Sequence, residues 1–326
     1  MHNGAVGIFS SGGSSATITK STLYGSGPVG HSLMAVSGGT VVANTITQFT
    51  NGWLSSAFAT GTNGSTTVTD ALVHTVGQGS PIWFAVGVNG RLHGERIHGN
   101  ADSSPIAIID GSHDFLLSDS VITGTGPGGI VFTSPADWAP TATVTLNNTW
   151  LSVTGPSTPA VWVGSSRAFL TIYNTRITTE SGVLVMANES QLDPTYTKYG
   201  GTLPLAALSP GFVNIDISYS SLRGDLVAYM GSHVIWALHA ASIWTGGTYP
   251  VDVANATSSV DIIVSHDSQW HLTHDSRVQN LFDDDTSLSN VVSNGFNITY
   301  QLDAPLNSWL GGRTIPLQGG GFATPY

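Results

Sequence analysis

The hexapeptides 146–151 (LNNTWL) and 172–177 (IYNTRI) show a unit that recurs along the chain: an apolar residue, four small or polar residues, and a second apolar residue. The unit can be read ten times, mostly at intervals of twenty-odd residues. The other copies are residues 18–23 (ITKSTL), 41–46 (VVANTI), 68–73 (VTDALV), 92–97 (LHGERI), 117–122 (LSDSVI), 217–222 (ISYSSL), 238–243 (LHAASI) and the variant 264–270 (VSHDSQW). Self-similarity at a short fixed period is typical of repeat architectures.

A short apolar segment followed by a turn lies between successive copies, for example residues 106–109 (IAII), 161–163 (VWV) and 226–229 (LVAY). Because a strand rises about 3.3 Å per residue, a period with three such strands closes one coil of a parallel β-helix. Helical solenoids need longer periods and strong helix formers, whereas this chain has 39 glycines and only 9% charged residues. The sequence therefore predicts an all-β fold, a single-stranded right-handed parallel β-helix (β-solenoid) of about 11–12 coils.

The repeats run through the whole chain, which predicts a single β-helix domain over residues 1–326. One long gap between copies holds residues 190–210, which we interpret as an inserted loop, and residues 290–326 break the period and are expected to form the terminal coils and a C-terminal cap. The first coil has no cap in the sequence. An open sheet edge can pair with another chain, so an oligomer through the uncapped N-terminal coil is one expectation.

Charge and composition exclude several classes of function. The net charge of -11 and the nine scattered basic residues argue against nucleic acid as a partner. No apolar run of 18 residues occurs, so we expect no membrane span, and the absence of cysteine excludes thiol chemistry. Met1 is followed by no signal-peptide pattern in this chain, although five N-x-Ser/Thr sequons are consistent with secretion.

Residues 261–281 (DIIVSHDSQWHLTHDSRVQNL) carry a resemblance to a known group of proteins. The run resembles the coils of bacterial autotransporter passenger domains and adhesin-like β-helix proteins, and residues 241–246 (ASIWTG) are similar to the coil that often precedes them. Over its last hundred or so residues the chain is similar to secreted microbial and fungal β-helix proteins of the pectate-lyase-like superfold. The resemblance implies an extracellular or cell-surface location and does not imply a reaction.

The resemblance and the scarcity of charge favour a non-catalytic protein that presents an extended face for adhesion or glycan binding. The expected partner is a polysaccharide or a cell-surface glycan. Aromatic faces stack on sugar rings, so exposed tryptophans are the natural candidates for contact. The predicted binding residues are Trp138, Trp53, Trp270, Arg91 and His93. Trp162 and Trp236 are flanked by apolar residues and are instead predicted to be core residues or to stack between coils.

The alternative is a polysaccharide-active enzyme, and a glycoside hydrolase needs two carboxylates about 5 to 10 Å apart. The densest acidic region offers Glu95 with Asp114 or Asp110, next to Arg96. Alternation along a strand places Arg91, His93 and Glu95 on one face. A lyase is less favoured, because basic residues are scarce.

A structural interpretation competes with this catalytic one. Asp119 occupies the same repeat position as Asp70, Asn148 and Asn174, where an Asx side chain suits a turn. Asp110 precedes Gly-Ser in a predicted turn. In this interpretation the carboxylates stabilise turns and take no part in catalysis.

Two groups of residues could bind a metal, but both have a simpler interpretation. His266, His271 and His274 could converge only if a turn folds them together, and we expect them to be outward polar residues. The run 283–285 (DDD) could bind Ca²⁺, but a solvated acidic turn is the commoner case. We therefore predict no metal site and no cofactor.

Overall fold

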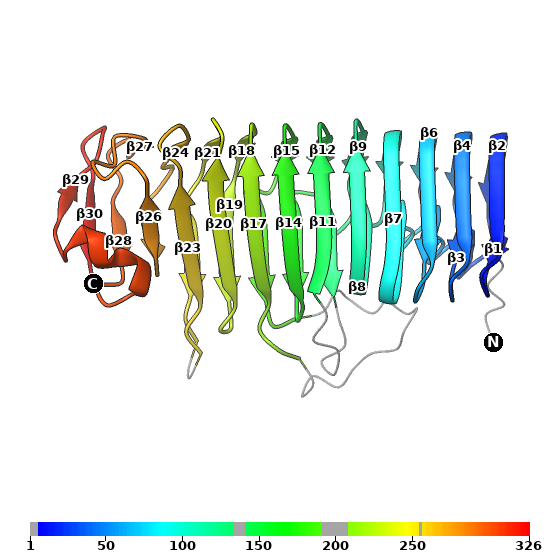
Figure 1. The fold of residues 1–326 in the computed structure, drawn as a ribbon, viewed down its shortest axis with the longest axis horizontal. Coiled ribbons are helices and arrows are strands. Elements are labelled where there is room, and N and C mark those ends of the chain that lie inside the picture. Colours follow the sequence, from blue (N-terminus) through cyan, green and yellow to red (C-terminus); the bar gives the residue numbers. More distant parts are fainter. Residues whose placement is uncertain (1–5, 134–140, 191–207, 254–255) are drawn as a thin grey trace.

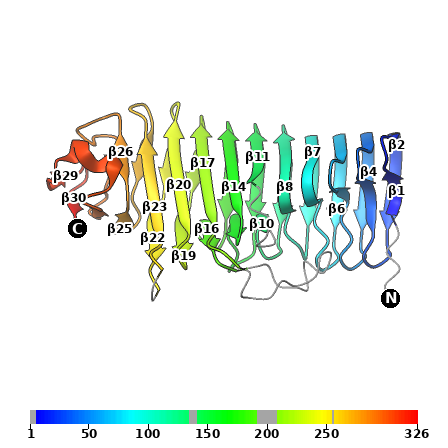
Figure 2. The ribbon, with the colours of Figure 1, turned by 60° about the horizontal axis from the view of Figure 1, so that its bottom comes forward.

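The computed structural model describes residues 6–133, 141–190, 208–253 and 256–326. Parallel strands of successive coils lie side by side along the molecule, as Figures 1 and 2 show. The predicted fold class is confirmed: the chain forms a β-solenoid of about twelve turns. In the described part of the chain, no helix is long and apolar enough to cross a membrane.

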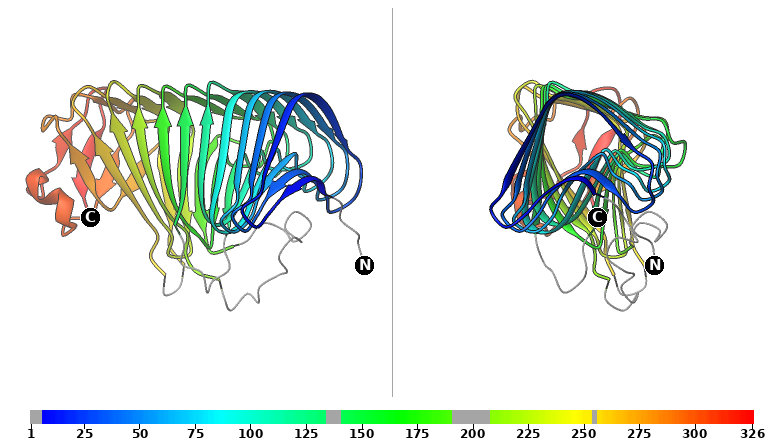
Figure 3. Two further views of the ribbon diagram at one scale, coloured as in Figure 1. Left: turned by 45° about the vertical axis from the view of Figure 1, so that its right-hand side comes forward. Right: turned by 90° about the vertical axis from the view of Figure 1, so that its right-hand side faces the viewer.

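Each coil contributes to three faces around one interior (Figure 3). Face 1 contains β1 (Val6–Ser10), β3 (His31–Ala35), β5 (Phe58–Thr60), the start of β7 (Trp83–Ala101), the start of β8 (Ala107–Ser118), β10 (Ile130–Thr133), β13 (Val161–Gly164), β16 (Val183–Asn188), β19 (Asp225–Tyr229) and β22 (Thr248–Val251). Face 2 contains the first halves of β2 (Ser15–Gly25), β4 (Thr40–Thr50) and β6 (Ser65–Thr75), the middle of β7, the end of β8, β11 (Thr141–Asn147), β14 (Arg167–Tyr173), β17 (Phe212–Ser218), β20 (His233–His239), β23 (Ser259–Val264) and β26 (Leu281–Asp283).

Face 3 follows face 2 in every coil. It contains the ends of β2, β4, β6 and β7, then β9 (Val121–Gly124), β12 (Trp150–Val153), β15 (Arg176–Thr179), β18 (Ser221–Arg223), β21 (Ile243–Thr245), β24 (Gln269–His271) and β27 (Val291–Val292). The C-terminal end is built from β25 (Ser276–Val278), β28 (Ile298–Tyr300), the 3₁₀ helix η2 (Pro305–Leu310), β29 (Ile315–Pro316) and β30 (Phe322–Pro325). β29 runs antiparallel to β30, which ends the parallel stacking.

In nine coils, the bend between faces 2 and 3 contains a residue with positive φ. We call these residues the bend column: Lys20, Thr45, Asp70, Arg96, Asp119, Asn148, Asn174, Tyr219 and Ala240, with φ between 43° and 55°. Asp and Asn tolerate this left-handed conformation better than most residues. The shared repeat position of Asp70, Asp119, Asn148 and Asn174 is thus the bend itself.

The residue after the bend is often a buried Ser or Thr that links two coils. The Thr175 hydroxyl accepts a hydrogen bond from the Thr149 N–H (3.2 Å) and donates to the Tyr173 carbonyl (2.9 Å). The same link joins Thr175 to Ser220 and Ser220 to Ser242. These hydroxyls satisfy backbone amides that the bend would otherwise leave buried and unpaired.

Replacement of Thr175 by valine should therefore destabilise the fold. The Thr149 N–H would stay buried without an acceptor, at a cost of about 1–3 kcal/mol in the free energy of unfolding. Thr171→Val, on the exposed side of β14, is the matched control and should change stability by no more than about 0.5 kcal/mol. Denaturant titration of both variants measures the difference, and equal stability would contradict this role of the hydroxyl.

Two of the ten repeat copies are shifted by two residues from the strand register, and a third, 238–243, ends one residue early because Leu222 aligns with the buried Trp244. The strand pairing aligns Val68 with Gly94 and Val73 with Gly99, so the fourth coil places glycines where other coils have large apolar residues. A Cβ on Gly94 would lie 2.5 Å from the ring of Trp83, which fills that part of the interior. The copy predicted at 92–97 therefore begins two residues before the position that the register gives it. The copy predicted at 41–46 is shifted in the same way, because Ala43 and not Val41 aligns with Val68.

Candidate functional site

Arg91, His93 and Glu95 lie in β7 on the outer side of face 2. They alternate with the buried residues Leu92 and Gly94, which confirms that the three side chains share one face. That face is an open sheet surface, and in register Arg91 lies beside Asp114 of β8.

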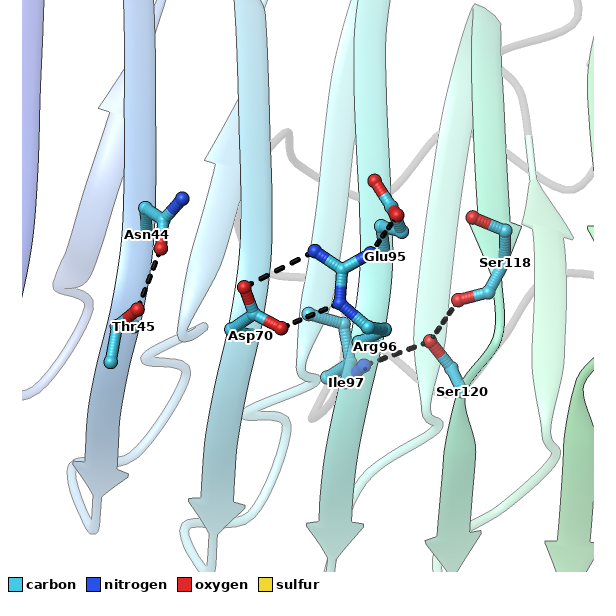
Figure 4. Close-up of polar contacts among 8 residues, drawn as sticks. All are labelled: Asn44, Thr45, Asp70, Glu95, Arg96, Ile97, Ser118 and Ser120. Carbon is cyan, nitrogen blue, oxygen red and sulfur yellow. Dashed lines mark hydrogen bonds and ion pairs between the residues drawn. The ribbon is translucent and has the colours of Figure 1, made fainter.

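Glu95 and Arg96 are engaged in an ion-pair cluster at the bend (Figure 4). The Arg96 guanidinium donates from Nε to Asp70 Oδ1 (2.6 Å), from Nη2 to Asp70 Oδ2 (3.1 Å), and from Nη1 to Glu95. The hydrogen bond from Arg96 holds the pKa of Asp70 below its usual value, and the pairing raises the pKa of Arg96. Two of the four predicted catalytic residues, Glu95 and Arg96, are therefore paired with each other, and Arg96 also links two neighbouring coils through Asp70.

The strand register does not bring the proposed carboxylate pair together. Glu95 aligns with Ser118, which lies four residues beyond Asp114 on β8. Four residues of strand span about 13 Å, which exceeds the separation that either hydrolase mechanism uses. Asp110 lies still further along β8 from Ser118, so it is not a closer partner for Glu95.

Asp110 lies within strand β8, just before Gly111 (φ 109°), where the strand bends from face 1 to face 2. Burial raises the pKa of its carboxyl to about 6. The nearby His113 is buried and structural: its Nδ1 accepts a hydrogen bond from the Gly90 N–H, and its Nε2 lies 3.2 Å from the Asp110 carbonyl. A raised pKa suits a general acid, but the structure pairs Asp110 with no second carboxylate among the described residues.

The predicted binding tryptophans have different outcomes. Trp270 is fully buried, so its assignment as a binding residue is wrong. Its ring stacks on that of Trp244 with centroids 5.0 Å apart, and its Nε1 donates to the Gly246 carbonyl (3.0 Å). Trp53 is half-buried, and Trp138 lies outside the described residues. Of the predicted core pair, Trp236 is fully buried, whereas Trp162 is half-buried on the outside of face 1.

Face 3 carries a concave surface that is lined in part by aromatic and basic side chains. Two adjoining hollows of about 370 and 530 Å³ lie over β15, β18 and β21 and share Thr178, Arg223 and Thr245 in their lining. We call this surface the face 3 groove. Tyr219 of the bend column lines one part of it, and Asp225 lines the other.

Aromatic residues continue the face 3 groove at its N-terminal side. Trp150 of β12 is 44% exposed, and the Arg176 guanidinium stacks over its ring, 4.9 Å from the centroid. Tyr219, 56% exposed, packs edge-to-face on Tyr173 with centroids 5.3 Å apart. Flat exposed rings beside arginine and threonine side chains are the elements of a sugar-binding surface.

The charged side chains that line the groove are Arg176, Arg223 and Asp225. Arg223 is exposed, and its guanidinium has no ion-pair partner among the described residues. Asp225 is the one carboxylate in the lining, and its Oδ1 accepts a hydrogen bond from the Gly247 N–H (2.9 Å). A hydrolase needs a second carboxylate, and the part of the chain that the structure describes places none in either hollow.

The groove residues Trp150, Arg176, Tyr219 and Arg223 were not predicted as a site. Trp150 and Arg176 hold the same position in their hexapeptides, one residue before the closing apolar residue. Alternation places that position outward, so the repeat itself contained this signal. The groove around them depends on the turns that follow β15 and β18, which the repeat does not describe.

The candidate metal residues do not converge. Within the described residues, no group of three or more His, Cys, Asp or Glu side chains is placed to bind a metal ion. His271 contacts Gln269 Oε1 (2.9 Å), and His274 faces Asp225 at 3.7 Å. The acidic run at 283–285 is not a simple solvated turn, because Asp283 points inward and is 2% exposed.

Comparison with known proteins agrees with the architecture. A family model described as "Right handed beta helix region" matches residues 1–149. No curated protein and no solved structure gives a significant match. The match and the stacked parallel coils together identify the fold of this protein as a right-handed parallel β-helix.

Proposed function

We propose that this β-helix protein binds a glycan along face 3 without cleaving it, as an extracellular or cell-surface protein. The observation that carries the proposal is the face 3 groove, in which Tyr219 offers a ring and Arg223, Thr178 and Thr245 offer hydrogen-bond donors, with the exposed ring of Trp150 beside it under Arg176. Neighbouring parallel strands lie about 4.8 Å apart. A polymer lying along the solenoid axis would therefore meet an equivalent position on each coil.

The outer side of face 3 continues toward the N-terminus as an aromatic column. Tyr24, which is 79% exposed, lies 6.4 Å from Phe49 between ring centroids, and Phe49 lies 5.6 Å from His74. The His74 ring is held by Asp102 at 2.8 Å. This column extends the proposed surface beyond the groove and favours a long glycan as the ligand.

Binding should depend on the groove and not on face 2. Trp150→Ala and Arg223→Ala are each expected to weaken affinity about tenfold or more, because each removes a central contact at a cost of more than about 1.4 kcal/mol. Arg91→Ala and Phe169→Ala, both exposed on face 2, are the matched controls and should bind as the native protein does.

A panel of insoluble plant, fungal and bacterial polysaccharides provides the assay. We expect retention on at least one polysaccharide, loss of retention in both groove variants, and no release of reducing ends. Retention that is lost in Arg91→Ala and kept in Arg223→Ala would move the site to face 2. Release of reducing ends that stops in Glu95→Gln or Asp114→Asn would replace the binding proposal by the hydrolase.

A further inference from the structure

A buried carboxyl group lies near the C-terminal end of the solenoid, apart from the groove. Asp283 ends β26, and its register partner is the core residue Val264, so the side chain points into the interior. η2 packs beside this strand (Figure 1). Asp283 is 2% exposed and Asn290, next to it, is 8% exposed.

Three hydrogen bonds fix how these two side chains meet. Asp283 Oδ1 accepts from the Asp285 N–H (2.8 Å) and from Asn290 Nδ2 (3.1 Å). The same Nδ2 also donates to the Ser265 carbonyl (3.2 Å). Because both of these partners are acceptors, the amide of Asn290 must present its nitrogen to them and its oxygen elsewhere.

The arrangement leaves two acceptor atoms without a donor. Asp283 Oδ2 and Asn290 Oδ1 are both buried, and neither has a hydrogen-bond partner. A buried acceptor without a donor is costly, and a charged one more so. The two side chains are already hydrogen-bonded to each other, so a single proton on one of these two oxygens would allow a hydrogen bond between them.

We propose that Asp283 is held as the neutral carboxylic acid and that its Oδ2–H donates to Asn290 Oδ1. The acid and the amide then form a cyclic pair, with Nδ2 donating to Oδ1 of the acid and Oδ2 donating to Oδ1 of the amide. This pair closes the loop 284–290. The Asn290 carbonyl also accepts a hydrogen bond from the Trp270 N–H, which fixes the C-terminal end of the loop. Loss of the proton places an unpaired negative charge in the interior at the last coils.

The surrounding charges favour the neutral form. Burial, together with the smaller effect of the charges of Asp285 and Asp284 in the same loop, raises the pKa of Asp283 to about 7, although the hydrogen bonds from the Asp285 N–H and from Asn290 lower it. The turn that contains Ser265 carries the exposed His266 and Asp267. η2 carries no titratable side chain. The protein therefore has an acid-stabilised contact at its C-terminal end.

The sign of the pH effect follows from linkage. The folded pKa lies above the ordinary value of 3.8, so the folded state binds the extra proton between these two values. This contribution to stability is complete below the ordinary pKa and is lost as the pH rises toward 7. Asp283→Asn keeps the acceptor and replaces the acid hydrogen by an amide hydrogen, which no pH change removes.

Thermal unfolding of the native protein, Asp283→Asn and the control Asp284→Asn at pH 5 and pH 8 tests the proposal. We expect the Asp283→Asn midpoint to exceed the native midpoint by several degrees at pH 8 and by clearly less at pH 5, because only part of the stabilisation is lost at pH 5. The Asp284→Asn midpoint should change between the two pH values as the native one does. A native pH profile in Asp283→Asn would overturn the proposal. So would a lower midpoint of that variant at both pH values together with a rise of the native midpoint on addition of Ca²⁺, since a cation would then occupy the place of the proton.

Infrared spectroscopy gives a readout that does not depend on stability. The native protein at pH 5 should show a protonated-carboxyl band that is missing from the spectrum of Asp283→Asn, and this difference should fade as the pH rises through about 7. Identical native and variant spectra at pH 5 would show that Asp283 is ionised and would overturn the proposal.

Discussion

Trp270→Ala is expected to destabilise the C-terminal coils severely. Trp270 is fully buried, and its ring lies parallel to that of Trp244 within 12°. The ring of Trp236 packs on that of Trp244 in turn, with centroids 5.4 Å apart. Removal of an indole from such a stack leaves a large cavity and costs about 3–5 kcal/mol in the free energy of unfolding. It also leaves the Gly246 carbonyl without its donor. Denaturant titration followed by tryptophan fluorescence measures the loss.

Trp150→Ala is the matched control because it removes the same side chain from the surface of face 3. Its stability should lie within about 1 kcal/mol of the native value, while its glycan binding falls. If Trp270→Ala were as stable as Trp150→Ala, the tryptophan stack could not be part of the core that holds the last coils together.

Gly111→Ala is expected to produce the second large loss. Gly111 lies in β8 at φ 109°, and a Cβ there would lie 1.9 Å from the Gly87 carbonyl oxygen of the preceding coil. Neither backbone can move without breaking the ladder that pairs Gly87 with Gly111. We expect a loss of about 3 kcal/mol or more, measured by denaturant titration.

Gly182→Ala separates the steric clash from the effect of backbone conformation. Gly182 also has positive φ (76°), but a Cβ there would meet no atom within 4 Å. Its replacement should cost only about 1–2 kcal/mol, the strain of a left-handed alanine. Equal losses in the two variants would show that the close approach of Gly87 and Gly111 does not limit the stacking of coils.

The fold could be predicted from the sequence because the interior of every coil repeats the same alternation. Trp270 and Trp150 show that the same alternation also separates buried from exposed tryptophans. Trp270 is the closing apolar residue of its repeat and Trp150 is the residue before the closing one, so alternation places the first inside and the second outside. The assignment of Trp270 to binding went against the repeat, and the same rule would have found Trp150.

The candidate site was harder to predict because it depends on contacts between coils. Alternation correctly put Arg91, His93 and Glu95 on one face, but it contains no information on which residue of the next coil lies beside them. That register separates Glu95 from Asp114 and brings Arg96 onto Asp70. A pattern of period two also matches itself when shifted by two residues, which explains the misplaced copies at 41–46 and 92–97.

Features that arise from single exceptions to the repeat could not be predicted from it. The hollows over β18 depend on a strand of only three residues followed directly by Gly224 and Asp225. The neutral Asp283 depends on an acidic side chain that occupies an inward position where the two preceding coils have Val264 and Leu238. A solvated turn was the natural interpretation of three consecutive aspartates.

Hydroxyl-radical footprinting with and without the retained glycan is the most direct test of the proposed function. We predict that the glycan protects Trp150 and Tyr219 from oxidation, because both rings are exposed at the face 3 groove or beside it. Phe169 on face 2, exposed to a similar extent, should be oxidised equally in both samples. Protection of Phe169 and unchanged oxidation of Trp150 and Tyr219 would contradict the proposal that the glycan lies along face 3.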